Sequence, residues 1–212
     1  MLKFQDLSVQ FKNSPKTTME KGASLIVVML LLVIVSILGI SGVQISMMAE
    51  RGTRNDRDTQ IAWQSAEAAL MDAEFDILGL PAGSPTKRNG LFTRGNTDID
   101  QFIPNCGTSG ANIGLCALNV SGKPAWLAAD FTMTGNNAPT AAFGTYTGRT
   151  FPSGNAGIQP AQPPRYVIEL IPEPSMKRTK NPSDMKYIYR ITAMGFGPNA
   201  DTQVVSQVLF RN

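Results

Sequence analysis

The stretch EKGASLIVVMLLLVIVSILGISGVQISMMAERG, residues 20–52, determines the fold of this 212-residue chain. Its apolar part, the 27 residues 23–49, contains no Asp, Glu, Lys or Arg. A helix of that length spans about 40 Å, more than the roughly 30 Å hydrocarbon core of a bilayer. A cleaved secretory signal is shorter and is followed closely by a small-residue cleavage site, which is missing here. The stretch therefore predicts a membrane-spanning helix that the mature protein keeps.

The helical pattern continues beyond the apolar stretch. Residues 16–80 contain no proline, and residues 59–78 place apolar side chains three and four positions apart on one helix face. This stripe consists of Trp63, Ala66, Leu70, Ala73 and Ile77. We expect it to pack on a globular domain, with the acidic residues mostly off it; these are Glu67, Asp72, Glu74 and Asp76. The helix should end near Gly79, a C-cap candidate that is followed by Pro81.

The globular part, residues 80–212, alternates strand-like segments with loop-rich ones. Five strands are expected, at residues 115–120, 141–146, 165–171, 187–195 and 202–210. The last three should form an antiparallel meander on the helix stripe, with residues 197–201 as a hairpin turn. Residues 81–96 and 143–164 are rich in Gly, Pro and Asn and are expected to be solvated loops. The predicted fold class is thus α+β, a long N-terminal helix packed on a small antiparallel β-sheet.

The positive charge lies mainly before the apolar helix. Residues 1–22 contain four lysines against Asp6 and Glu20, whereas the rest of the chain has 15 basic and 14 acidic side chains. By the positive-inside rule, residues 1–22 lie in the cytoplasm and the globular part lies across the membrane. Nucleic acid is therefore not an expected partner, and the basic stretch 176–186 is expected to be a solvated loop. The expected segments are 1–22 (cytoplasmic leader), 23–49 (apolar half-helix), 50–79 (amphipathic half-helix) and 80–212 (globular part).

The chain has two cysteines and no histidine. Cys106 and Cys116 lie close together in a Gly-rich stretch outside the cytoplasm, where disulfides persist. We expect a disulfide, worth roughly 2–3 kcal/mol in the chain-entropy model, with two separate free thiols as the alternative. The lack of histidine excludes Ser-His-Asp and Cys-His catalysis as well as His-ligated zinc. We expect no catalytic residue, no cofactor and no metal ligand.

Several segments resemble type IV pilins, and the PilX-type minor pilins in particular. Lys21-Gly22 followed by ASLIVVMLLLVIVSILGIS is similar to a class III leader junction. The PilX-like segments are RNDRDTQIAWQSAEAALMDAE (54–74), GLCALNVSGKPAW (114–126), PRYVIEL (164–170) and YIYRITAMGFGPNADTQVVSQVLF (187–210). The resemblance implies that a membrane-embedded prepilin peptidase cleaves between Gly22 and Ala23 and methylates Ala23. It also implies that the half-helix 23–49 later forms part of the core of a filament.

Two residues depart from the usual pilin pattern. The mature chain would begin with Ala23 in place of phenylalanine, and its fifth residue is Val27, where major pilins carry a glutamate. Such a carboxylate can pair with the N-terminal ammonium of a neighbouring subunit, because an isolated charge in an apolar core is costly. A subunit that lacks the carboxylate suits the tip or the start of a filament. A tip pseudopilin of type II secretion also lacks it, but is typically larger than residues 81–212 allow.

The resemblance implies a minor pilin that primes the assembly of a type IV pilus and is incorporated near its tip. Its implied partners are other minor and major pilins, the prepilin peptidase, the assembly platform, a large tip adhesin and, before assembly, inner-membrane lipid. The globular part would be periplasmic at first and lie on the cell surface later. The alternatives are a type II secretion tip pseudopilin and a signal-anchored periplasmic enzyme. Met1 and Met19 are both possible start residues, and the choice leaves the cleavage site unchanged.

Overall fold

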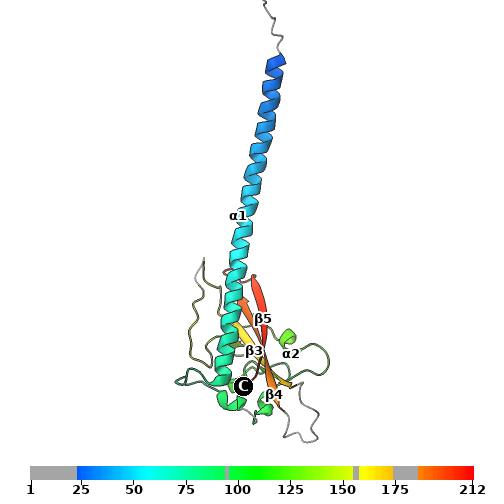
Figure 1. Ribbon diagram of the computed structural model, residues 1–212. Helices are drawn as coiled ribbons and strands as arrows, with labels where there is room; N and C mark the ends of the chain where they lie inside the picture. Colours follow the sequence, from blue (N-terminus) through cyan, green and yellow to red (C-terminus); the bar gives the residue numbers. More distant parts are fainter. Residues whose placement is uncertain (1–22, 94–95, 155–157, 174–185) are drawn as a thin grey trace, which may run out of the picture. The chain divides into compact units, whose positions relative to one another are not determined.

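The computed structural model describes residues 23–93, 96–154, 158–173 and 186–212. The chain divides into two compact units, Met1–Arg51 and Gly52–Asn212, and we call the second the head. Helix α1, Ala23–Leu78, belongs to both units (Figure 1). The predicted leader, residues 1–22, lies outside the described residues, as does the predicted basic loop apart from Lys186.

Helix α1 ends where the sequence predicts. Gly79 adopts a left-handed backbone (φ +72°), and its N–H donates to the carbonyl of Asp76 (3.3 Å). The N–H of Leu80 donates to the carbonyl of Phe75 (2.8 Å). This pair of bonds is a Schellman motif, which satisfies carbonyls that the last helical turn leaves unpaired. A β-carbon on Gly79 would also lie 2.5 Å from the Asn89 side chain, so both the conformation and the space require glycine.

The head contains a five-stranded mixed sheet (Figure 1). Strands β3 (Arg165–Pro172), β4 (Tyr187–Phe196) and β5 (Gln203–Phe210) form the predicted antiparallel meander. Strand β1 (Leu115–Cys116) pairs with β3 in parallel, and β2 (Ala141–Ala142) pairs with β3 antiparallel. The predicted α+β fold, a long helix packed on a small sheet, is therefore confirmed, but the sheet is mixed and not antiparallel throughout, because β1 adds a parallel pair. The long connection from β1 to β3 returns the chain to the same end of the sheet, as a parallel pair requires.

Along the chain, several short elements lie between α1 and β3. They are the 3-10 helices Asn89–Phe92, Ile99–Gln101 and Gly110–Asn112, and the one-turn helix α2, Ala125–Ala128. Strands β1 and β2 have two residues each, fewer than predicted. After β1 the N–H of Ala117 donates to Ile103 and not to β3, and after β2 the chain turns at Gly144 with φ +81°.

The main core lies between α1 and one face of the sheet, which we call the helix face. Its sheet residues alternate along each strand, as period-2 patterning requires. They include Tyr166, Ile168 and Leu170 of β3 and Tyr189, Ile191 and Ala193 of β4, which pack with Ala69, Ala73 and Ile77 of α1. A second cluster, on the opposite or far face, consists of Cys106, Cys116, Ala125, Phe131 and Val167.

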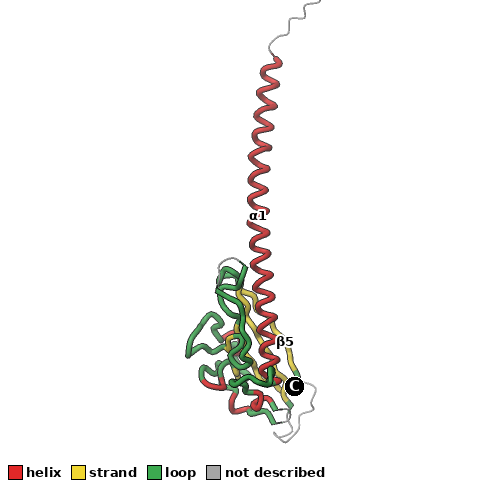
Figure 2. The backbone as a smooth tube through the Cα atoms, turned by 90° about the vertical axis from the view of Figure 1, so that its left-hand side faces the viewer, coloured by secondary structure: helices red, strands yellow, loops and turns green. Residues whose placement is uncertain are grey.

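The two stretches predicted as solvated loops contain buried residues. Arg88 and Phe92 of the first stretch and Tyr146 and Thr147 of the second are all buried. Phe92 packs edge-on against Tyr189, with ring centroids 5.4 Å apart. Figure 2 shows the loops gathered on one side of α1 in the head, with β5 on the other. The prediction of solvation is wrong for these residues, because they cover the end of the helix and their polar side chains bond to it, whereas residues 81–83 and 85–87 are exposed as predicted.

Candidate functional site

The apolar half-helix exposes its side chains along its whole described length. Its large apolar side chains between Leu25 and Met48 are 44–74% exposed. By length and composition, α1 is the one helix of the described residues that could span a membrane. The hydroxyls of Ser36 and Ser41 donate to carbonyls one turn earlier, at 2.7 and 2.9 Å, so they are satisfied inside the helix. The surface is thus suited to lipid or to packed helices.

Val27 belongs to this surface and is 56% exposed. Val27 is the predicted position of the missing pilin glutamate, and the exposed apolar surface continues through it. Ala23, the predicted first mature residue, is the first residue of α1. Gly22, on the other side of the predicted cleavage site, lies outside the described residues.

In the head, α1 packs on β4 through small residues. The buried residues of the helix are Ala62, Ser65, Ala66, Ala69, Asp72, Ala73, Asp76 and Ile77. A β-carbon on Gly195 of β4 would lie 2.1 Å from the carbonyl oxygen of Ala62 and 2.2 Å from the backbone nitrogen of Ala66. The two backbones are therefore in direct contact, which is why alanine and glycine face each other here.

This packing corrects the predicted stripe. Ala66, Ala73 and Ile77 are buried as predicted, and Leu70 is partly buried against the main core. Trp63, in contrast, is 47% exposed and does not belong to the helix-to-sheet contact. The close approach of β4 leaves no space for an indole ring, so the helix turns Ala62 inward and Trp63 outward.

A buried ion pair joins the end of α1 to the following loop. The Nε of Arg88 donates to both carboxylate oxygens of Asp76 (3.1 and 3.0 Å), and its Nη2 donates to Oδ2 (2.7 Å). The hydroxyl of Tyr166 donates to the same oxygen (2.9 Å). Both charged side chains are almost fully buried, 2% and 0% exposed. Such a pair must be fully hydrogen-bonded, since the loss of either partner leaves an uncompensated buried charge.

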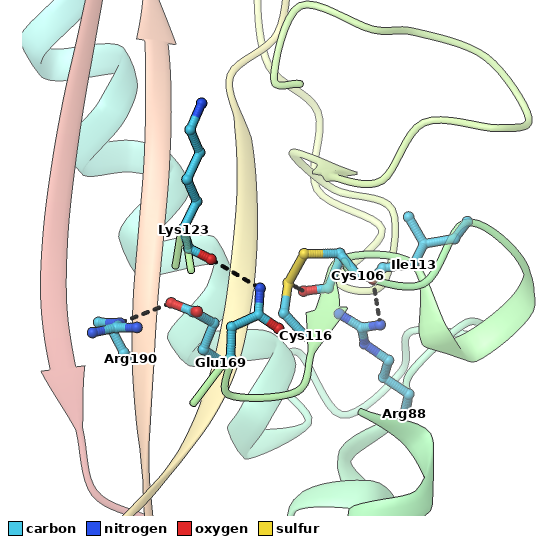
Figure 3. Close-up of a disulfide and its surroundings, with 9 residues drawn as sticks. Arg88, Cys106, Ile113, Cys116, Lys123, Glu169 and Arg190 are labelled. Atoms are coloured by element: carbon cyan, nitrogen blue, oxygen red, sulfur yellow. Dashed lines mark hydrogen bonds and ion pairs between the residues drawn. A yellow bond between two sulfur atoms is a disulfide. The ribbon is translucent and has the colours of Figure 1, made fainter. Parts of the chain in front are cut away.

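The remaining donors of Arg88 bind the loop that the disulfide closes. Nη1 donates to the carbonyls of Ala111 (2.6 Å) and Ile113 (2.8 Å), and Figure 3 shows Arg88 directed at Ile113. The guanidinium also lies 3.5 Å from the ring centroid of Tyr146, a cation–π contact. One arginine thus connects helix, disulfide loop and a loop residue from far along the chain.

The pKa values of this cluster follow from burial and charge. Burial lowers the pKa of Arg88, but the Asp76 carboxylate together with Tyr166 and Tyr146 more than offsets this effect, so the pKa of Arg88 is raised. Burial and, next, the charge of Asp76 raise the pKa of Tyr166 well above its usual value. Tyr166 therefore remains a neutral hydrogen-bond donor and Arg88 remains a cation at physiological pH.

Asp72, one turn earlier, holds the second loop. Its carboxylate accepts hydrogen bonds from the N–H of Gly144 (2.7 Å) and the hydroxyl of Thr147 (2.6 Å), and Arg149 lies at 3.4 Å. Burial raises the pKa of Asp72, and these three partners reduce the shift. The guanidinium of Arg149 also lies 4.9 Å from the ring centroid of Phe75.

The sequence places Asp72 and Asp76 off the packed face, and this expectation is wrong. Both are buried because their partners lie outside the helix: Arg88 belongs to the loop that follows α1, and Thr147 comes from a loop far along the chain. A helical pattern by itself predicts that polar residues are exposed, since it contains no information on partners outside the helix. The arginines in the two Gly/Pro-rich loops could have indicated that Asp72 and Asp76 are buried, because arginine is the residue best suited to buried ion pairs.

The predicted disulfide is present (Figure 3). Cys106 and Cys116 are bonded, and Cys116 belongs to β1. The closed loop is tight, because a β-carbon on Gly107 would lie 2.3 Å from the carbonyl oxygen of Asn112. Since this loop supplies the carbonyls that Arg88 binds, the disulfide and the buried ion pair stabilise the same part of the head.

A second ion pair lies on the far face of the sheet. Glu169 of β3 and Arg190 of β4 are directly opposite each other, and the Nε of Arg190 lies 2.7 Å from Oε2 of Glu169 (Figure 3). Glu169 is fully buried, and its Oε1 has no hydrogen-bond partner among the described residues. Within that part of the chain, no group of three or more His, Cys, Asp or Glu side chains is placed to hold a metal ion.

Comparison with known proteins agrees with this architecture. The family model "PilX N-terminal" matches residues 21–70, and the family model "Type IV pilus assembly protein PilX C-term" matches residues 49–212. No curated protein and no solved structure matches the chain. Together the two models cover the apolar half-helix and the entire head, so the resemblance of the separate segments extends over the whole described protein. The chain therefore belongs to the PilX family and is a minor pilin of type IV pilus assembly.

Proposed function

We propose that this minor pilin primes the assembly of a type IV pilus and is incorporated near the tip. The observation that carries the proposal is Val27, an apolar residue on an exposed helix surface where the pilin pattern has a glutamate. A subunit without that carboxylate cannot neutralise the N-terminal ammonium of a neighbour inside an apolar bundle. It therefore fits best where only one side of its half-helix meets other subunits.

The proposed sequence of events follows from the surface of the half-helix. Residues 23–49 lie first in the inner membrane, with residues 1–22 in the cytoplasm and the head in the periplasm. After removal of the leader, the same apolar surface exchanges lipid for the half-helices of other pilins. The assembly platform and a large tip adhesin would be further partners. The head keeps its own structure throughout, because its ion pairs and disulfide are internal to it.

Co-expression with a prepilin peptidase is expected to remove residues 1–22 and to leave a methylated Ala23. The reason is the Lys21-Gly22 junction directly before the apolar helix. Intact-mass and N-terminal peptide spectrometry of the membrane fraction measures the result. A Gly22→Ala variant at the cleavage site is the matched control and should stay uncleaved. An unchanged N-terminus in the wild-type protein would contradict the proposed processing.

Replacing Val27 with glutamate is expected to reduce the number of pili several-fold without raising the number of copies of this subunit in each pilus. At the tip no further ammonium lies above the new carboxylate, so the charge remains unpaired in an apolar bundle. Val27→Leu, which keeps the surface apolar, is the control and should assemble normally. Quantitative immunoblotting of sheared pili gives the copy number. Tip placement is wrong if the Val27→Glu subunit becomes as abundant as a major pilin.

A further inference from the structure

Strand β5 is the free edge of the sheet. The strand order is β1-β3-β4-β5, so β5 has a neighbour on one side only. Next to the hairpin turn, the N–H of Gly197 donates to the carbonyl of Thr202 (2.8 Å), which marks a hydrogen-bonded pair. Hydrogen-bonded and non-bonded pairs alternate along an antiparallel ladder. The backbone groups of Gln203, Val205, Gln207 and Leu209 therefore point away from β4, and the described residues include no backbone partner for them.

This edge has none of the usual protection against pairing. Natural edge strands are shortened, bulged, or marked with lysine, other inward-pointing charges or proline. Residues 203–210 are eight in number, about 27 Å long, and contain neither proline nor a charged side chain. The nearest charges along the chain are Asp201 before the strand and Arg211 after it. Arg211 pairs with Glu173, and its side chain is nevertheless 64% exposed.

Both sides of the edge offer apolar surface. On the far face, Val205 and Leu209 are 44% and 62% exposed. On the helix face, Val208 and Phe210 are partly buried against the main core. Figure 2 shows β5 at the margin of the head, with the loops on the opposite side of α1. An added strand could thus continue the apolar packing of both faces.

We propose that the outer edge of β5 binds an extended strand of another protein chain, uncharged between its two ends, as an additional strand of the sheet. Four N–H and four C=O groups in alternation specify a backbone as the complementary ligand, and the flanking side chains favour apolar residues in it. The bound strand runs antiparallel to β5. It then carries an acidic residue at its N-terminal end, beside Arg211, and a basic residue at its C-terminal end, beside Asp201.

A second copy of this chain is the rival occupant, because its own β5 has the same order of charges. Antiparallel pairing of two β5 strands about a twofold axis would make the α1 segments of the two heads run in opposite directions. Copies that share one membrane, as the proposed function requires, have parallel helices. The geometry therefore favours a different chain, because its strand can pair with β5 without requiring two membrane helices to run in opposite directions.

The test uses the full-length protein in detergent micelles and a labelled synthetic peptide. The peptide has four Thr-Val repeats between an N-terminal glutamate and a C-terminal lysine. Fluorescence anisotropy should show saturable binding to the wild-type protein. Val205→Pro removes one outward N–H but no bond to β4, and is expected to weaken binding at least tenfold. Val205→Thr keeps the N–H and is the matched control, with binding within about twofold of wild type.

Two controls distinguish strand pairing at the β5 edge from non-specific adsorption of the peptide. Exchanging the two terminal charges of the peptide should weaken binding a few-fold, since each charge then meets a like charge. If circular dichroism shows that Val205→Pro does not fold, proline is placed in the peptide instead. Two peptides are made, each with one proline whose missing N–H lies on a different hydrogen-bonding edge of the strand. The peptide with proline on the edge that faces β5 should not bind the wild-type protein.

Several outcomes would overturn the proposal. They are a failure of the wild-type protein to bind the peptide, equal binding by Val205→Pro, and a wild-type dimer that sediments as a monomer after Val205→Pro. The last result would assign the edge to a second copy. None of these measurements involves a filament, so their failure leaves the proposal of tip placement standing, and the reverse also holds.

Discussion

Replacing Gly195 with alanine is expected to lower the free energy of unfolding of the head by about 3 kcal/mol. The new β-carbon would lie 2.1 Å from the carbonyl oxygen of Ala62 and 2.2 Å from the nitrogen of Ala66. Both are backbone atoms of a helix, so no side chain can move aside, and β4 must separate from α1. The main core between helix and sheet then loses packing along its length. Urea denaturation followed by the fluorescence of Trp63 and Trp126, both in the head, measures the change.

Gly83→Ala is the matched control for this prediction. A β-carbon at Gly83 has no atom within 4 Å, and its φ lies outside the left-handed region. We expect a change within about 0.5 kcal/mol, as for surface substitutions in general. Equal stability of the Gly195→Ala and Gly83→Ala proteins would show that α1 and β4 do not touch at Gly195.

Replacing Asp76 with alanine should cost about 3–5 kcal/mol, the usual effect of breaking a buried ion pair. Arg88 would keep its charge in a site where its side chain is 2% exposed, and the hydroxyl of Tyr166 would lose its acceptor. The same denaturation experiment measures the loss. Because Arg88 also binds the disulfide loop, protection of that loop from proteolysis should fall together with the stability.

The control for Asp76→Ala is a surface ion pair on the same helix. Arg57 lies 3.3 Å from Asp58, and its side chain is 54% exposed. Arg57→Ala should change the stability by less than about 1 kcal/mol. Adding Arg88→Met to Asp76→Ala should cost clearly less than the sum of the two single effects, since the stranded charge is removed. Strict additivity would mean that the two residues do not act as a pair.

These predictions concern the head because its stability depends on contacts between particular residues. The half-helix, in contrast, needs only a surface that is apolar throughout. Ala62, Ala66 and Gly195 fit one another at backbone distance, and Asp76 has one arginine that can reach it. Residues 23–49 only have to be apolar, helical and free of unsatisfied polar groups. A destabilised head would therefore reduce pilus assembly even if leader removal and membrane insertion proceed normally.

Much of the fold follows from local patterns in the sequence. The length of α1, its end at Gly79, the β3–β4–β5 meander and the disulfide were all predictable. Each depends on residues close together in the chain: an uncharged run, a cap, a period of two, and two neighbouring cysteines. Val27, which carries the proposed function, was also visible in the sequence, because it departs from the pilin pattern at the predicted position of a glutamate.

The tertiary structure decided which side of the helix is inside. Trp63 is apolar and has the correct spacing, yet it is exposed, because Gly195 brings the β4 backbone too close for any residue larger than alanine. Asp72 and Asp76 are charged, yet they are buried, because Arg149 and Arg88 reach them from other loops. Hydrophobic periodicity predicts that a helix has a buried face. Which residues form that face depends on the backbone distance and charged partners supplied by distant segments, and these exist only after the chain has folded.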